Sequence, residues 1–131
     1  MEYGEIINYY TTPINQVELE NIEPFRWLSN SIREGKENLT SNTVDFIIIK
    51  ILDNNKKPYK FIRKKSFDVY VIGTFRKFFN PTLEVAEAFS DFYLEMGLLP
   101  NIISVPKNYF LEREQYYSKK IKNGILIYDR N

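Results

Sequence analysis

The stretch NPTLEVAEAFSDFYLEMG, residues 80–97, decides the predicted fold because it has the complete pattern of an amphipathic helix. Asn80 can cap the first turn, and Pro81 suits the first helical position, where a backbone N–H would be unpaired in any case. Gly97 offers a left-handed stop. Apolar residues recur between these ends at spacings of three and four, which predicts one buried stripe. The stripe consists of Val85, Phe89, Phe92, Tyr93 and Met96.

The opposite face of this helix is acidic, and the helix contains no basic residue. The acidic residues are Glu84, Glu87, Asp91 and Glu95. Like charges at helical spacing repel one another, and Glu95 lies near the negative end of the helix dipole. The face is therefore either a solvated surface or an acidic docking surface or carboxylate site, and the clustered charges lower helix stability.

A single α+β domain is the predicted fold for these 131 residues, a length that can bury a real hydrophobic core. Residues 23–35 predict a second helix, with Pro24 at its first position and Gly35 at its end. β-Branched and aromatic residues predict a sheet of four or five strands. The run VDFIIIKIL, residues 44–52, is nearly all apolar and predicts a central strand buried on both faces. The expected strands are a meander of three at 44–52, 59–63 and 67–75, a short strand at 102–105 and a terminal strand at 125–128. Residues 6–10 could also form a short edge strand, which Pro13 ends. Because the connections are short, we expect an antiparallel sheet with two or three helices packed mainly on one face.

Residues 107–122 fit two structures. Glutamates come early and lysines late, which matches a helix dipole. The sequence KIKNGILIY also contains the Asn-Gly pair of a two-residue hairpin turn. We favour a helix followed by a strand, and the hairpin remains the alternative.

The residue types that are absent exclude several kinds of site. The chain has no Cys and no His, so disulfides, thiolate nucleophiles, zinc sites with nitrogen or sulfur ligands and histidine triads are excluded. It also lacks a glycine-rich phosphate loop and a serine-nucleophile motif. Asp45 and Asp68 could approach each other on adjacent strands, although such residues more often mark strand ends. We expect no catalytic residue, no cofactor and no metal site.

The location of the protein follows from its hydropathy. No apolar run approaches the roughly 20 residues that a membrane span needs. The sequence MEYGEIINYY lacks the basic start of a signal peptide. These features predict a cytoplasmic protein without membrane contact.

Charge is distributed unevenly along a chain whose net charge is +1. Residues 53–77 carry eight positive and two negative side chains, with aromatic residues between them. Lysine and arginine neutralise phosphates and aromatic rings stack on bases, so this block predicts weak, sequence-independent contact with DNA or RNA. Lysine-rich sheet edges also prevent pairing between chains, which is the alternative interpretation. The basic residues are Lys56, Lys57, Lys60, Arg63, Lys64, Lys65, Arg76 and Lys77.

A protein-interaction module, such as an inhibitor of a host factor, is the alternative function. It would use the acidic helix face together with Trp27, which sits beside the apolar stripe of the second helix and suits a contact hot spot. Ten Tyr, ten Phe and one Trp are more aromatic residues than one modest core readily hides. Exposed apolar patches usually mark contacts, which predicts a homodimer.

The composition carries one resemblance. The chain is short, lacks Cys and His, and is rich in Ile, Asn, Lys, Tyr and Phe, as in VDFIIIKILDNNKKPYKF and FRKFFNPTLEVAEAFSDFYLEMG. In this respect it resembles the small orphan proteins of rod-shaped and filamentous viruses of hyperthermophilic archaea. The resemblance implies a non-enzymatic viral accessory protein in the host cytoplasm. It includes no functional motif, so it assigns no site residue.

Overall fold

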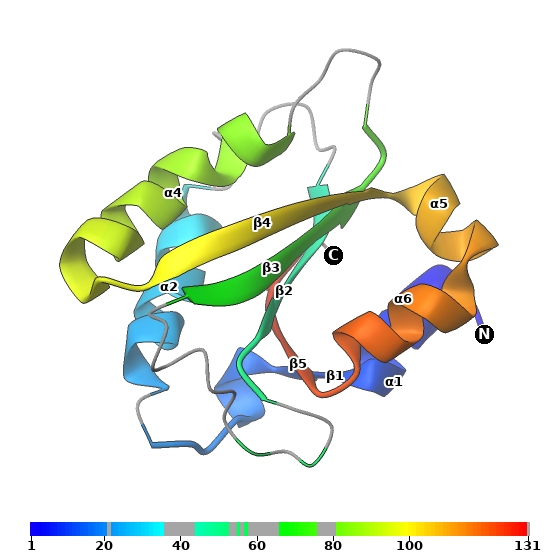
Figure 1. Cartoon of the computed structure of the whole chain (residues 1–131), viewed down its shortest axis with the longest axis horizontal. Helices are drawn as coiled ribbons and strands as arrows, with labels where there is room; N and C mark the ends of the chain where they lie inside the picture. Colours follow the sequence, from blue (N-terminus) through cyan, green and yellow to red (C-terminus); the bar gives the residue numbers. More distant parts are fainter. Residues whose placement is uncertain are drawn as a thin grey trace.

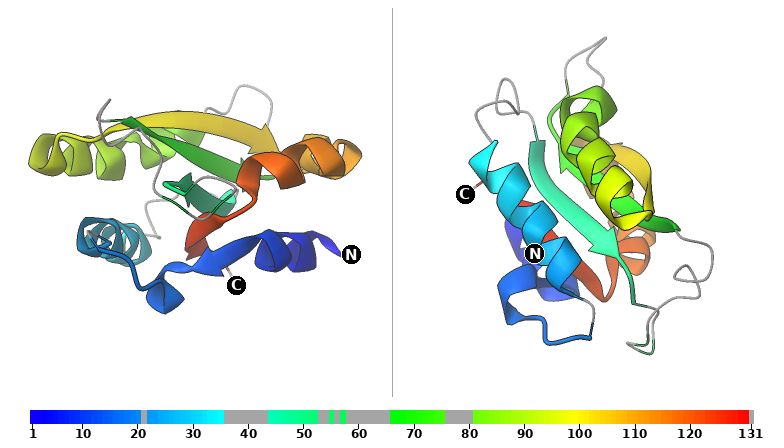
Figure 2. Two further views of the ribbon diagram at one scale, coloured as in Figure 1. Left: turned by 60° about the horizontal axis from the view of Figure 1, so that its bottom comes forward. Right: turned by 90° about the vertical axis from the view of Figure 1, so that its left-hand side faces the viewer.

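A five-stranded mixed sheet with helices on both faces forms the structure of the protein, a computed structural model (Figures 1 and 2). The structure describes residues 1–20, 22–35, 44–52, 55, 57, 66–75 and 81–130, with only the backbone of residues 81–87. The helices are α1 (Tyr3–Tyr10), α2 (Glu23–Glu34), α4 (Pro81–Met96), α5 (Lys107–Glu112) and α6 (Glu114–Ile121), with a 3-10 turn η1 (Ile14–Gln16). The strands are β1 (Thr11–Pro13), β2 (Val44–Lys50), β3 (Ser66–Gly73), β4 (Leu99–Pro106) and β5 (Gly124–Asp129).

The strand order is β1-β5-β2-β3-β4, and the sheet is antiparallel only at its centre. β2 pairs antiparallel with β3 and β5, whereas β1 pairs parallel with β5 and β4 pairs parallel with β3. The expected antiparallel sheet is therefore wrong at both edges. At the β4 edge the reason is the long connection through α4, because a helical crossover between adjacent strands returns the chain in the same direction.

β2 lies at the centre of the sheet, and all seven of its residues are buried. This confirms the expectation of a central strand covered on both faces. Its two neighbours are β3 and β5, so β2 and β3 pair directly instead of belonging to a meander of three consecutive strands. The expected strand at 59–63 lies outside the described residues.

Two apolar cores flank the sheet, one on each face. Alternate residues of the central strands point to opposite sides, so Ile47 joins one core and Ile48 the other. One core packs against α2 and α4, and the other against α1, α5 and α6. The expectation of two or three helices mainly on one face is therefore wrong: the described residues form five helices, and both faces are covered. Strands that are apolar on both sides require such cover.

The first core is built from aromatic rings, as the helical spacing predicted. Phe89 and Phe92 of α4 have 1% and 0% of their surface exposed. The ring centroid of Phe92 lies 5.3 Å from that of Phe25 and 5.6 Å from that of Phe67. The predicted orientation of α4 is thus confirmed for its central turns.

The end of α4 departs from the predicted stripe. Tyr93 and Met96 are exposed. β4 begins at Leu99, so the last turn of α4 lies at the end of the sheet, at the left margin of Figure 1. Little sheet remains beneath this turn to bury its apolar side chains.

Residues 3–10 form helix α1 instead of the expected edge strand. Tyr3, Ile6, Ile7 and Tyr10 follow helical spacing, and all four belong to the second core or pack against it. The strand that follows, β1, ends at Pro13 as expected.

Residues 107–121 form α5 and α6, so the helical interpretation is confirmed over the hairpin. Asn123 adopts a positive φ of 63°, which turns the chain into β5. A Cβ on Gly124 would lie 2.5 Å from Ile48 Cγ2 and 2.7 Å from the carbonyl oxygen of Ile121, so only glycine fits there. The Asn-Gly pair is therefore explained by close packing against β2.

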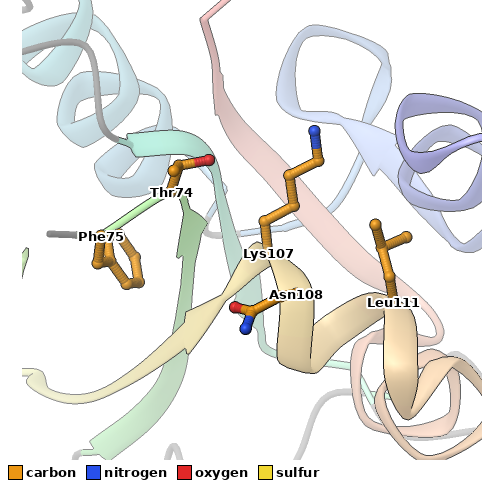
Figure 3. Close-up of a pocket in the computed structure, with 5 residues that line it drawn as sticks. All are labelled: Thr74, Phe75, Lys107, Asn108 and Leu111. Atoms are coloured by element: carbon orange, nitrogen blue, oxygen red, sulfur yellow. The ribbon is translucent and has the colours of Figure 1, made fainter.

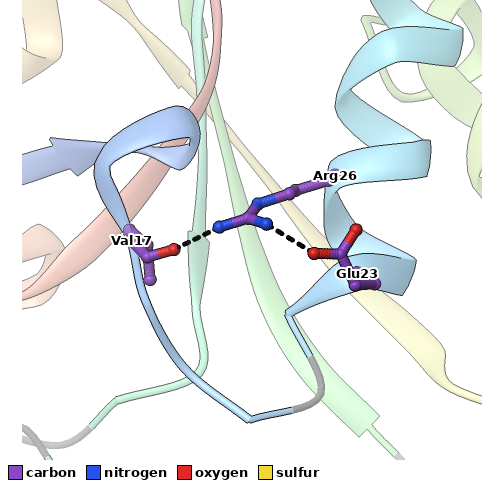
Figure 4. Close-up of polar contacts among 3 residues, drawn as sticks. All are labelled: Val17, Glu23 and Arg26. Carbon is purple, nitrogen blue, oxygen red and sulfur yellow. Dashed lines mark hydrogen bonds and ion pairs between the residues drawn. The ribbon is translucent and has the colours of Figure 1, made fainter.

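Arg26 on α2 fixes the segment that precedes the helix. Its Nη2 donates a hydrogen bond of 2.6 Å to the carbonyl oxygen of Val17, and its Nη1 forms an ion pair with Glu23 (Figure 4). These contacts hold the segment after η1 against α2.

Candidate functional site

The predicted nucleic-acid-binding block lies almost entirely outside the described residues. Lys57 is described; its side chain is exposed and has an interaction partner. The other predicted residues, Lys56, Lys60, Arg63, Lys64, Lys65, Arg76 and Lys77, lie in the segments that the structure does not describe. Contact with nucleic acid stays a prediction.

The predicted protein-binding residues lie on two neighbouring helices of one face. α2 and α4 run side by side over the sheet (Figure 2, right). Trp27 on α2 is 42% exposed, and its ring stacks on Phe92 of α4 with centroids 6.4 Å apart. Asp91 and Glu95 are exposed on α4. Glu84 and Glu87 belong to the same helix, but their side chains are outside the described set.

Exposed apolar side chains adjoin these carboxylates. Leu94 is 76% exposed, and Leu99 at the start of β4 is also exposed. Neither residue belongs to the predicted stripe, because helical spacing places Leu94 opposite Phe92 and Leu99 follows the end of the helix. We call the combined set the α2–α4 surface. Its described members are Trp27, Asp91, Tyr93, Leu94, Glu95, Met96 and Leu99.

A buried carboxylate forms the centre of a polar cluster elsewhere in the molecule. Asp45 sits at an irregularity near the start of β2 and is buried. The Tyr3 hydroxyl donates a hydrogen bond of 3.1 Å to Asp45 Oδ2, and Arg130 Nη2 lies 3.1 Å from Oδ1. The backbone N–H of Arg130 also donates to the carbonyl oxygen of Asp45 at 3.0 Å. One carboxylate thus holds α1 and the segment after β5 at the same point.

Asp68 is not part of this cluster. Its partner on β2 is Lys50, near the opposite end of that strand from Asp45. The expected approach of Asp45 and Asp68 is therefore wrong, because the antiparallel register of β2 and β3 separates them. Asp68 instead accepts a hydrogen bond of 3.0 Å from the side chain of Asn101 on β4.

Two tyrosines near Asp45 are held in their neutral form. Burial raises the pKa of Tyr3, and the charge of Asp45 and the hydrogen bond to it raise that pKa further. Burial also raises the pKa of Tyr128, although the positive charge of Arg130 acts in the opposite direction. The Tyr3 hydroxyl therefore serves as a hydrogen-bond donor to Asp45 and is a poor general base.

A cavity of about 260 Å³ opens next to this cluster (Figure 3). It lies where the parallel strands β3 and β4 end, since Gly73 pairs with Pro106 and the lining residues follow directly. The cavity is lined by Thr74, Phe75, Lys107, Asn108 and Leu111. The Lys107 ammonium also lies 4.9 Å from the ring centroid of Tyr3, which links the cavity to the cluster.

Lys50 is the other buried charged residue with a clear structural role. Its ammonium donates a hydrogen bond to the carbonyl oxygen of Lys122, directly after α6. A positive charge at the carboxyl end of a helix stabilises its dipole. We therefore assign Lys50 to the packing of α6 against β2.

Within the ranges given above, no group of three or more acidic side chains is placed to hold a metal ion. Across those ranges, no helix has both the length and the apolar character to cross a membrane. Comparison with protein-family models, with curated proteins and with solved structures found no match to the chain.

Proposed function

We propose that the protein is an interaction module whose α2–α4 surface binds another protein, one that presents an apolar patch rimmed by basic side chains. The observation that carries the proposal is the exposure of Tyr93, Leu94, Met96 and Leu99 beside exposed carboxylates. Large apolar side chains that gather on a surface usually mark a contact.

The apolar part would supply most of the binding free energy. Burying a side chain such as that of Leu94 is worth about 1.5–3 kcal/mol. Trp27 adds a large ring that is already immobilised by stacking on Phe92. A pre-ordered aromatic side chain loses little conformational entropy on binding, which is one reason why tryptophan is common at binding hot spots.

The charge on α4 favours a partner with basic side chains. Asp91 and Glu95 are exposed, and no basic residue occurs in the helix to neutralise them. Lysine or arginine side chains around an apolar patch would complement these carboxylates, whereas an acidic partner would be repelled. Such complementarity mainly increases the association rate and the specificity.

The test compares two surface variants in capture experiments from the native cell. Leu94→Asp places a charge within the surface, and Tyr9→Asp places one on α1, where Tyr9 is similarly exposed at 71%. A true partner is retained by the wild type and by Tyr9→Asp and is lost by Leu94→Asp. Its affinity for the purified protein should then weaken tenfold or more in Leu94→Asp.

A test of self-association shows whether the α2–α4 surface binds a second copy of the chain or a different protein. Light scattering at high micromolar concentration tests the homodimer that the aromatic content predicts. A dimer that Leu94→Asp converts to monomers would assign the α2–α4 surface to a second copy and contradict the proposal. A monomer, or a dimer that survives this change, leaves the surface free for a different protein.

A further inference from the structure

The cavity at the ends of β3 and β4 is lined by both apolar and polar side chains. Phe75 and Leu111 supply the apolar side chains. Thr74 and Asn108 supply a hydroxyl and an amide, and Lys107 runs along one side (Figure 3). Ligand sites in α/β proteins often lie just beyond the carboxyl ends of parallel strands, where loops diverge.

Lys107 is held in place by a chain of contacts that leads into the interior. Its ammonium lies over the ring of Tyr3, 4.9 Å from the centroid. The hydroxyl of that ring is fixed by Asp45, whose charge is balanced in turn by Arg130. Among the described residues, no carboxylate lies within ion-pair distance of Lys107. The cavity is therefore lined by a positioned cation that no carboxylate of the described residues pairs with.

We propose that this cavity binds a small organic carboxylate with an apolar body. The carboxylate would contact the Lys107 ammonium, with Thr74 and Asn108 as additional hydrogen-bond donors. The apolar body would pack against Phe75 and Leu111. A volume of about 260 Å³ is below the roughly 300–1,000 Å³ of drug-sized sites, which favours a molecule smaller than a nucleotide.

The experiment is a calorimetric or NMR titration of the whole chain with three probes. Benzoate has both the charge and the apolar body, benzyl alcohol has only the body, and inorganic phosphate has only the charge. We expect benzoate to bind in the millimolar range and each of the other two probes to bind at least fivefold more weakly. Benzoate that fails to bind at tens of millimolar would overturn the proposal, as would equal binding of either other probe.

Lys107→Met removes the charge and keeps much of the apolar stem. Benzoate affinity should fall tenfold or more in this variant and recover in Lys107→Arg. The matched control is Lys120→Met, because Lys120 also lies over a tyrosine ring, at 5.4 Å from the centroid of Tyr116, away from the cavity residues. The benzoate affinity of Lys120→Met should stay within twofold of the wild-type value. Unchanged binding in a folded Lys107→Met protein, verified by circular dichroism, would remove the cavity from consideration.

Discussion

The two faces of the sheet are both covered by helices, but the cores beneath those helices differ in composition. Beneath α2 and α4 the core contains packed aromatic rings. Other apolar side chains of α4, such as those of Tyr93 and Met96, are exposed to solvent. Beside α1 and α5 the chain buries a charged group, Asp45, and leaves a cavity next to it. The proposed protein-binding surface thus lies on the first side of the sheet. The proposed small-ligand cavity lies on the second side.

The largest effect is expected in the ring core. Phe92→Ala removes contacts with Phe25, Phe67 and Trp27, and it should lower the free energy of unfolding by about 3–5 kcal/mol. Phe89→Ala should have a cost in the same range. Urea denaturation followed by circular dichroism measures both. A loss below about 1 kcal/mol in either variant would mean that this core is not closed by α4.

Asp45→Ala should have the next largest effect. It leaves the Tyr3 hydroxyl without its acceptor and removes the ion pair between Asp45 and Arg130, and it should lower the free energy of unfolding by about 1–3 kcal/mol. The cost stays below that of breaking a fully buried ion pair because the Arg130 side chain is 42% exposed and can be hydrated. Glu112→Ala is the control, since this exposed glutamate should change stability by no more than about 0.5 kcal/mol. Equal stability of the two variants would remove the contrast between the two sides of the sheet.

Tyr3→Phe removes the hydroxyl and keeps the ring. It should lower the free energy of unfolding by about 1 kcal/mol at pH 8. The pKa of Tyr3 is raised in the folded protein from a usual value of 10.0. The contribution of the Tyr3 hydroxyl to the free energy of unfolding is therefore fully present below pH 10. It is lost as the pH rises above 10, because Tyr3 ionises first in the unfolded chain. Denaturation at pH 8 and at pH 10.5 should show the difference between wild type and variant becoming smaller. A difference that grows with pH would contradict the assigned direction of the shift.

The smallest effect on stability is expected for the basic block, most of which lies outside the described residues. Replacing Arg63, Lys64 and Lys65 by Glu should change the free energy of unfolding by no more than about 0.5 kcal/mol per residue, as is usual for surface substitutions. The same change should abolish weak nucleic-acid binding whose affinity in the wild type falls steeply with salt. Gel-shift assays at low salt provide the measurement. If the wild type shifts neither DNA nor RNA, the block has only a solubilising role.

Sequence periodicity was sufficient to predict the buried side of single helices and strands. The spacing of Phe89 and Phe92 predicted which side of α4 is buried, and the apolar run at 44–52 predicted the central strand β2. Periodicity was insufficient for features that depend on how one helix or strand packs against another. The end of the sheet below α4 exposes Tyr93 and Met96, and no local pattern reports where a sheet ends.

The polar cluster could not be predicted for a related reason. Tyr3, Asp45, Lys107 and Arg130 come from four distant segments, and each is ordinary in its own surroundings. They meet because β2, β3, β4 and β5 bring their ends to one margin of the sheet. Pairing direction and register decide this meeting, and both follow from tertiary packing and not from residue spacing.

The position of β5 has a consequence for how the chain reaches its structure. β5 separates β1 from β2, and Thr11 pairs with Gly124. Until residues 124–129 arrive, β1 has no strand to pair with and β2 presents an open apolar edge. Contacts between such distant residues form slowly, because the entropy of closing a long loop must be overcome first. During synthesis on a ribosome, the interval before β5 emerges is therefore when a chaperone or a neighbouring nascent chain would find this edge accessible.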